Sequence, residues 1–407
     1  MAATASQVVT IIADDLTGAC DTGCLFAGAG PVGVLAPPVL TAADASMIAP
    51  VIAPIVAPII AMDTESRALP PRAAAAAVHA AARHLGERLT AGRVFKKVDS
   101  TLRGATGVEL TALLEHGPPF TGALVCPAFP AQRRVVRHGR LLVDSVPVHE
   151  SAIARDPAFR AATSDVAALL AGGAPVVALG LDDIRAGAEK VAHLLERHRG
   201  ALVAADAETD DDLATLAEAA LAAPGTLIAG SAGLGRALSR ALGCEAPAVA
   251  LPPGRARLVI VGSLHPASRA QLDALLAAGV PRVTADAEGH GDPAPAVAAL
   301  AAGRGALLAS ATAPGDREAV ARHLAAAAAR ILERATPDLV AVTGGDTAYA
   351  LLRALRPRRF DLMGAPADGL ALGRLLLPDD GRALSLLTKA GGFGGADLLT
   401  TILGGPS

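Results

Sequence analysis

The chain has 407 residues, of which 52% are hydrophobic, 18% charged and only 2% aromatic. This composition can bury a large core, which excludes intrinsic disorder, and the length predicts two to three domains. The 36 basic and 39 acidic residues give a net charge of −3, and no basic stripe for nucleic acid is visible. Seven Phe, one Tyr and no Trp leave few rings on which bases could stack. We therefore expect an α/β protein that binds no nucleic acid.

Neither the cysteines nor the apolar segments point to a secreted or membrane protein. Four scattered cysteines are too few for a disulfide framework, and Cys20 and Cys24 alone do not make a zinc site. The N-terminus has no basic segment and does not resemble a signal peptide. Ala45–Met62 is uncharged, but a proline at every fourth position prevents a continuous membrane helix. We predict a cytoplasmic protein in which this segment is an extended connection ending in a strand near Ile59–Met62.

Short apolar runs, polar or glycine turns and Ala/Leu-rich helices alternate along the chain. The first strand, Val8–Ala13, precedes a helix over Leu16–Ala27, and a strand at Val94–Val98 precedes a helix over Val108–His116. Further strands are predicted at Ala123–Cys126 (followed by a long Pro/Arg loop), Pro175–Leu179, Ala201–Ala204, Thr226–Ala229, Leu258–Val261, Leu307–Ala309, Leu339–Val342 and Leu384–Leu387. This alternation predicts mainly parallel sheets flanked by helices, with ligands at the carboxyl ends of the strands.

A Pro-rich, helix-poor segment over residues 244–254 is the best domain boundary. We predict an N-terminal domain over residues 1–243, this segment as linker, and a C-terminal domain over residues 255–407. Each domain is expected to hold one mainly parallel sheet, with a ligand cleft between the two domains.

Two adjacent carboxylates, Asp14 and Asp15, end the first predicted strand. At that position carboxylates can hold substrate hydroxyls, a metal ion or a proton being removed. One of them could simply cap the following helix, although a cap requires only one. Farther along, Arg67 follows another predicted strand and could bind a carboxylate through two hydrogen bonds.

The densest polar cluster of the sequence runs from Lys96 to Gly104. It includes a lysine, an aspartate, two hydroxyls and an arginine, namely Lys97, Asp99, Ser100, Thr101 and Arg103. Such groups at a strand end suit a small anion that carries hydroxyls, for example a sugar acid. A solvated loop with a surface ion pair is the alternative. For the arginine-rich loop Cys126–Arg134, the sequence does not separate a binding loop from an exposed one.

Three strand–turn units in the second half carry small residues at the turn. They contain Ser263, the run Gly344–Gly345–Asp346–Thr347, and Gly391 within a glycine-rich loop. Glycines at such turns let backbone amides face phosphate oxygens near a helix N-terminus. The chain has no GxxxxGK[ST] motif, so a P-loop fold is not expected. His265 is interpreted as a turn or packing residue rather than a base.

Together these blocks resemble the four-carbon acid sugar kinases, a group once catalogued as a domain of unknown function. The matching segments, in order over nearly the whole chain, are IIADDLTGACDTG, DTESR, KKVDSTLRG, CPAFPAQRR, VIVGSLHPASRAQ, TGGDTA and TKAGGFGGADLL. The resemblance implies an N-terminal domain that binds the sugar acid and a C-terminal domain that binds ATP. The implied reaction is Mg²⁺-dependent phosphorylation of the terminal hydroxyl of threonate, erythronate or an oxo-tetronate.

The resemblance also implies which residues bind each ligand. The acid would contact Asp15, Arg67 and the stretch Lys97–Thr101, with Asp14 close by. ATP would contact Ser263, Gly344–Thr347 and Gly391. The chain departs from the family at Cys20, where Asn is usual, and at Ala390 and Gly392, where Ser and Asn are usual.

Two carboxylates could accept the proton of the reacting hydroxyl, Asp15 in the acid-binding half and Asp346 in the nucleotide-binding half. We expect Asp15 to hold substrate and Asp346 to lie near Mg²⁺ or that hydroxyl. A nicotinamide-dependent dehydrogenase is disfavoured, because the only dinucleotide-like run, Gly28–Gly33, lies after a helix and before a strand. A sugar-acid sensor that binds nucleotide without turnover stays open. So do the identity of the acid, the metal ligands and homo-oligomerisation.

Overall fold

The structure is a computed structural model, and it describes residues 8–36, 57–116, 120–155, 162–285, 292–310, 316–378 and 381–404. The chain divides into two compact units. Within the described residues, the first unit comprises 8–30 and 57–245, and the second comprises 31–36 and 246–404. The proline repeat between residues 48 and 56 lies outside the described residues. No described helix is long and apolar enough to cross a membrane.

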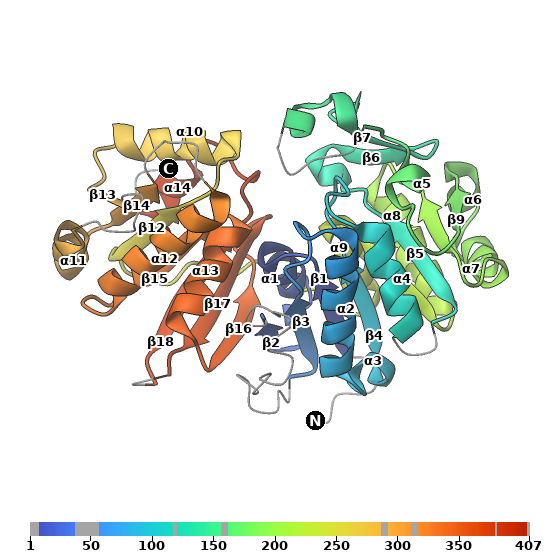
Figure 1. The fold of residues 1–407 in the computed structure, drawn as a ribbon, viewed down its shortest axis with the longest axis horizontal. Coiled ribbons are helices and arrows are strands. Elements are labelled where there is room, and N and C mark those ends of the chain that lie inside the picture. The colour runs from blue at the N-terminus through green and yellow to red at the C-terminus, as the bar shows by residue number, and fades with distance from the viewer. Residues whose placement is uncertain are drawn as a thin grey trace. The chain divides into compact units, whose positions relative to one another are not determined.

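The sheet of the first unit is parallel throughout. Its strand order is β3-β1-β4-β11-β5-β10-β9. The strands are β1 (Val9–Ala13), β3 (Ile59–Asp63), β4 (Arg93–Lys97), β5 (Gly122–Cys126), β9 (Val176–Leu179), β10 (Leu202–Ala205) and β11 (Thr226–Gly230). Most of their residues are buried, as expected for strands covered on both faces by helices (Figure 1).

The helices of the first unit form two groups, and the helices within each group contact one another. In one, α2 packs on α4; in the other, α1, α9, α8 and α7 pack in sequence (Figure 1). These helices are α1 (Leu16–Leu25), α2 (Pro71–Leu85), α4 (Thr106–His116), α7 (Ala188–Arg197), α8 (Asp210–Ala222) and α9 (Ala232–Ala241), with the short α3 (Arg88–Ala91), α5 (Val166–Leu169) and α6 (Leu181–Arg185) between them.

In the second unit the sheet is part parallel and part antiparallel. Strands β13-β14-β12-β15-β18 run parallel, and β17, β16 and β2 continue the sheet antiparallel. The strands are β2 (Val32–Leu35), β12 (Arg257–Val261), β13 (Arg282–Ala285), β14 (Ala306–Ser310), β15 (Leu339–Thr343), β16 (Arg359–Gly364), β17 (Leu370–Leu376) and β18 (Ala383–Lys389). The helices are α10 (Pro266–Ala277), α11 (Ala294–Ala301), α12 (Arg317–Leu332), α13 (Gly345–Leu355) and α14 (Leu398–Ile402).

One part of the core of the second unit lies between its sheet and the helices α10 and α14. Val259 and Val261 of β12 meet Leu272 and Leu275 of α10 there, together with residues of β14, β15, β17, β18 and α14. Because α10 begins directly after β12, this packing holds the strand-to-helix turn in place. Figure 1 shows α10 along the upper edge of this unit, with α12 and α13 packed against each other.

The α/β class and the two mainly parallel sheets are confirmed, but three features differ from expectation. The predicted Pro/Arg loop is a loop only to Gln132; beyond it, β6 (Arg134–Arg137), β7 (Arg140–Val143) and β8 (Val146–Pro147) form an antiparallel sheet. Two tight turns join these strands. Each turn has two residues in the left-handed region, His138 and Gly139 in the first and Asp144 and Ser145 in the second, and only one of these four is a glycine that would have signalled a turn.

The other two differences concern the second unit. Strands β13, β16 and β17 were missed; β16 and β17 form a hairpin, whereas the prediction looked for strand–helix alternation. Strand β2, placed by the sequence analysis in the N-terminal domain, pairs antiparallel with β16 and belongs to the second unit. Residues 244–254 form no helix or strand.

Candidate functional site

In the first unit, the strands β3, β1 and β4 end at the same edge of the sheet. Ala13 of β1 is in register with Asp63 of β3 on one side and with Lys97 of β4 on the other. The residues after these strands therefore meet. Among them are all the acid-binding candidates of this unit, here called the acid cluster: Asp14, Asp15, Arg67, Lys97, Asp99, Ser100, Thr101 and Arg103.

Arg67 is the centre of the acid cluster. Its Nε and Nη2 donate to the two oxygens of Asp14 at 2.9 and 2.8 Å, and its Nη1 and Nη2 donate to the two oxygens of Asp15 at 2.7 Å each. Burial raises the pKa of Asp14, but the charge and hydrogen bonds of Arg67, together with the charges of Lys96 and Lys97, outweigh this effect and the pKa is lowered. Arg67 thus uses its donors on carboxylates of the protein itself.

Asp15 also caps the helix that follows it. Its Oδ1 accepts from the amide of Gly18 at 2.9 Å, and its Oδ2 accepts from the Thr17 hydroxyl at 2.6 Å. The capping interpretation is therefore correct for Asp15, whereas Asp14 is held by Arg67. With the two bonds from Arg67, Asp15 accepts four hydrogen bonds, which is about the capacity of a carboxylate.

Asp99 organises the loop after β4. It accepts from Arg103 Nε at 2.9 Å and Nη2 at 2.8 Å, and from the Thr101 hydroxyl. Burial would raise its pKa, but the charges of Arg103 and Arg67 hold the pKa of Asp99 well below its usual range. The carboxylate is therefore ionised and fixes Thr101 and Arg103 in place.

Backbone strain occurs in two loops of the acid cluster. Glu65 and Leu102 adopt φ values of 46° and 55°, in the left-handed region that disfavours side chains. Such residues cost on the order of 1–3 kcal/mol each and concentrate at binding sites, where the surroundings hold them.

Two lysines at the end of β4 have different environments. Lys97 is 7% exposed and donates to the carbonyl of Val98 at 2.9 Å. Lys96 is fully buried, with its Nζ 2.6 Å from Oε2 of Glu109 on α4. The sequence analysis assigned no role to this buried pair, whose positive end contributes to the lowered pKa of Asp14.

In the second unit, the strands β12, β15 and β18 likewise end at one edge. Val261 is in register with Thr343, and Thr343 with Lys389. This alignment brings together Ser263, Gly344 and Gly391: a methyl group on Gly391 would overlap the Ser263 hydroxyl, and one on Gly344 would lie 3.3 Å from Ser263 Cβ. Gly344 also has φ of +93°, which favours glycine.

The loop after β18, residues 390–395, is held by its carbonyl groups. Lys389 Nζ donates to the carbonyls of Ala390 and Gly391 at 3.1 and 3.2 Å, and the Ser268 hydroxyl donates to Gly391 at 2.8 Å. Gln271 Nε2 lies 2.9–3.1 Å from three further carbonyls, those of Phe393, Gly394 and Gly395. With its carbonyls bound on one side, this loop can present amides to an anion on the other.

Lys389, Ser268 and Gln271 were not singled out from the sequence. The signal was available in part, because Ser268 and Gln271 are three residues apart on α10 and therefore share a face. Lys389 is 1% exposed, and burial lowers its pKa to about 8. No carboxylate among the residues that the structure describes pairs with Lys389, and buried lysines of this kind are rare, which marks this position.

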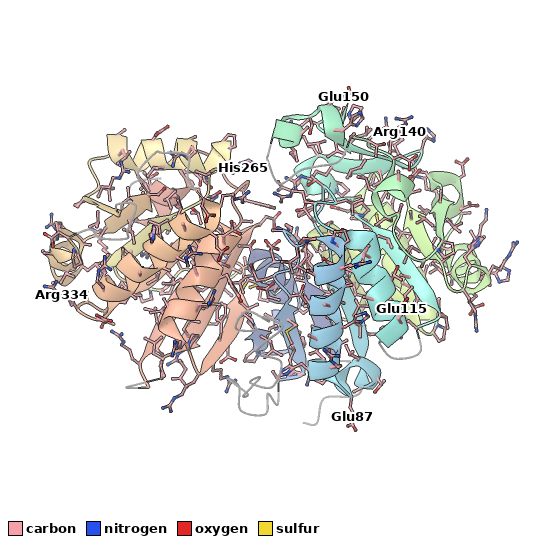
Figure 2. The ribbon with its side chains drawn as sticks, in the orientation of Figure 1. Glu87, Glu115, Arg140, Glu150, His265 and Arg334 are labelled. Carbon is pink, nitrogen blue, oxygen red and sulfur yellow. The ribbon has the colours of Figure 1, made fainter. Side chains whose placement is uncertain are left out.

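The remaining nucleotide-site candidates lie at the start of α13. Thr347 is buried and would block a side chain on Gly262, whereas Asp346 is 54% exposed and pairs with Arg317 at 3.3 Å. Gly345 is the first residue of the helix. His265 caps α10, accepting from the amide of Ala267 at 3.2 Å, as expected for a turn histidine; Figure 2 labels it at that helix end.

The described residues contain no group of three or more His, Cys, Asp or Glu side chains that could hold a metal ion. This does not conflict with a magnesium nucleotide, because Mg²⁺ is commonly bound by one or two carboxylates together with phosphate oxygens and water. Asp346, half-exposed beside the glycine turn, is the carboxylate that fits that arrangement.

Comparisons with known proteins also separate an N-terminal from a C-terminal domain. Residues 9–238 match the family model of a sugar-binding N-terminal domain, and residues 258–399 match that of a nucleotide-binding C-terminal domain. A D-threonate kinase of Bordetella bronchiseptica is 36% identical, over 96% of this chain and 95% of that protein. A 3-oxo-tetronate kinase of Methylobacterium radiotolerans is 32% identical, over 96% and 97%.

A solved structure from Salmonella typhimurium has the same fold, with a TM-score of 0.73 at 22% identity over 97% of this chain and 98% of that one. The chain thus matches both domain models in order, and it matches two relatives over nearly their full lengths. The chain belongs to the four-carbon acid sugar kinase family and is a phosphotransferase that acts on a sugar acid.

Proposed function

We propose that this protein transfers the γ-phosphoryl group of ATP to the terminal hydroxyl of a four-carbon sugar acid such as threonate or erythronate. The observation that carries the proposal is the presence of two strand-end sites of different chemistry in one chain. The first unit offers charged groups and hydroxyls at the ends of β1, β3 and β4. The second offers a glycine-rich loop whose carbonyls are bound on one side.

The acid cluster suits a small polyhydroxylated anion. Ser100 and Thr101 supply hydroxyls, Lys97 supplies an ammonium, and the carboxylate of Asp14, which accepts two hydrogen bonds from Arg67, has capacity left to accept from a substrate hydroxyl. Arg67, Asp99 and Arg103 hold these groups in fixed positions. A rigid, pre-paired cluster reduces the entropy lost when substrate is oriented for reaction.

The second unit suits the phosphates of a nucleotide. Ser263, Gly344–Thr347 and Gly391 lie at the ends of three adjacent strands, and the glycines leave room for close approach. Asp346 would hold Mg²⁺ together with the phosphate oxygens, and the ion would neutralise charge that develops on the transferred group. The substitutions at Ala390 and Gly392 leave the proposed contacts intact, because they are made by the backbone.

Phosphoryl transfer needs little covalent participation by the protein. It requires the reacting hydroxyl and the leaving ADP oxygen in line, exclusion of water and a carboxylate near the hydroxyl proton. Asp15 already accepts four hydrogen bonds, which suits a fixed acceptor better than a proton acceptor. We therefore assign to Asp346 either acceptance of the hydroxyl proton or binding of Mg²⁺. The variant Asp346→Asn is expected to lose turnover while it still binds ATP.

The test is ADP release with Mg-ATP against D- and L-threonate, D- and L-erythronate and their oxo derivatives. We expect turnover with one acid or with a closely related pair; the oxo acids belong in this panel because one relative is a 3-oxo-tetronate kinase. If none of the acids supports ADP release, and both ligands still stabilise the protein against heat, the protein is a non-catalytic sensor and not a kinase.

A further inference from the structure

The guanidinium groups of the acid cluster are already neutralised within the protein. Arg67 donates four hydrogen bonds to Asp14 and Asp15. Arg103 binds Asp99 through Nε and Nη2. A substrate carboxylate could bind either arginine only in competition with these carboxylates, so its partner must be sought among other cations.

Arg134, the first residue of β6, is such a cation. Its Nη1 donates to the hydroxyl of Ser100, which is itself 6% exposed and part of the acid cluster. Its Nε is buried and has no hydrogen-bond partner among the residues that the structure describes. A buried donor without a partner costs roughly 1–3 kcal/mol, so this guanidinium is not fully compensated within the protein.

The backbone fixes Arg134 in this position. Its amide and carbonyl pair with those of Phe129 at 3.2 and 2.7 Å, and the preceding Arg133 is in the left-handed region at φ of 52°. Upstream, the hydroxyl of Ser231 on the α9 turn donates to the carbonyl of Ala128 at 2.5 Å. The loop is therefore anchored at several points, and the side chain does not depend on a mobile segment.

The neighbouring arginines of the same small sheet have other surroundings. Arg133 pairs with Asp144 at 2.7 Å with its side chain 80% exposed, and Arg137 pairs with Glu208. Arg140 of β7 is exposed, and Figure 2 labels it at the upper right. Of these four arginines, Arg134 alone bonds to the acid cluster.

We propose that Arg134 is the specificity-determining residue that binds the carboxylate of the sugar acid, with Ser100 aligning its guanidinium. A planar guanidinium can bind a carboxylate through two parallel hydrogen bonds, which also orients the substrate; the ammonium of Lys97 is a point charge that does not impose this geometry. Burial lowers the pKa of Arg134, in keeping with a cation whose surroundings do not fully compensate it. The inference rests on the proposed function, since it assigns one group of that substrate.

The experiment compares wild type with Arg134→Lys, Arg134→Met and the matched control Arg140→Gln. Each is assayed with the best acid of the panel and with the corresponding carboxamide, which keeps the hydroxyls and lacks the charge. We expect Arg134→Met to lose about 100-fold in kcat/KM for the acid and less than threefold for the carboxamide, because one or two charge-assisted hydrogen bonds are removed. KM for ATP should not change, Arg134→Lys should fall between, and Arg140→Gln should match wild type.

Two outcomes would overturn the inference. An equal loss for acid and carboxamide would mean that Arg134 only supports the loop, and no loss would mean that another cation binds the carboxylate. Thermal unfolding of each variant shows whether it is folded; if Arg134→Met is not, the same comparison is made with Arg134→Lys.

Failure of the proposed function is recognised separately. If wild type releases no ADP with any acid, calorimetric titration of the acids into wild type and Arg134→Met still tests the inference. If wild type binds an acid and Arg134→Met does not, the role of Arg134 is supported and the kinase function is rejected. If wild type binds no acid, both are rejected.

Discussion

The two strand-end sites are built from different materials. In the first unit, charged side chains at the ends of β1, β3 and β4 neutralise one another, with Arg67 between Asp14 and Asp15. In the second unit, the corresponding edge is made largely of glycine-rich backbone. The side chains of Lys389, Ser268 and Gln271 hold that backbone through hydrogen bonds to its carbonyl groups.

This difference indicates where each site tolerates change. A site made of paired charges loses its function when one partner is removed, because the other is left buried and unpaired. A site made of amides tolerates changes in its own side chains, provided that the residues behind the loop remain. The departures from the family at Ala390 and Gly392 lie in this loop, where changes of side chain are tolerated.

The largest effect is expected for Arg67→Met. The substitution leaves two largely buried carboxylates, 4% and 14% exposed, without their common counter-ion. We expect the free energy of unfolding to fall by about 3–5 kcal/mol and turnover to be lost. Urea denaturation measures the first effect, and the exposed pair Arg133–Asp144 provides a control, because Arg133→Met should cost less than about 1 kcal/mol. Equal losses for the two variants would contradict a special role for charge pairing in the acid cluster.

The next effect is expected for Gln271→Leu, which frees the carbonyls of residues 393–395. Because the loop loses its fixed orientation, KM for ATP should rise at least tenfold while KM for the acid stays the same. Asp273→Asn, an exposed change on the same helix, is the control. A rise in both KM values would show that Gln271 supports the fold and not specifically the loop.

Lys389 predicts a dependence of stability on pH. Burial holds the folded-state pKa of Lys389 at about 8, below the 10.5 of an exposed lysine, so above pH 8 the folded protein releases this proton while the unfolded chain retains it. Stability should therefore rise with pH, and the increase from pH 8 to pH 9 should be about 1 kcal/mol larger in wild type than in Lys389→Met. Denaturant titrations at the two pH values measure it. Parallel pH profiles for the two proteins would show that the lysine is already hydrated.

The smallest effect is expected when the family-typical residues are restored by Ala390→Ser and Gly392→Asn. A side chain at residue 392 would come within 3.2 Å of the His265 ring, which can move aside because it is at the surface. If backbone amides provide the contacts, KM for ATP should change less than threefold in steady-state assays. A tenfold improvement would instead show that this chain lost real nucleotide contacts at these positions.

The sequence predicted where the sites lie better than how they are connected. The ends of parallel strands share an edge, so Asp14, Arg67 and Lys97 could be placed together once their strands were recognised. The partner of Arg67 could not be predicted, because Asp14 lies 53 residues away and several carboxylates were available to it. The Pro/Arg loop was underestimated for a related reason: the turns at His138 and Ser145 use left-handed residues that the sequence does not mark.

The pairing of β2 with β16 has a consequence for synthesis of the chain. Val32 and Gly33 emerge from the ribosome about 330 residues before their partners Leu362 and Asp361. At roughly 5–20 residues per second, this edge of β2 waits on the order of 15–70 s for its partner, long after most of the first unit can have folded. An exposed strand edge over that interval can pair with other chains. Truncation after residue 245 would make this state permanent, so the first unit produced alone should aggregate unless Val32–Leu35 is removed or made polar.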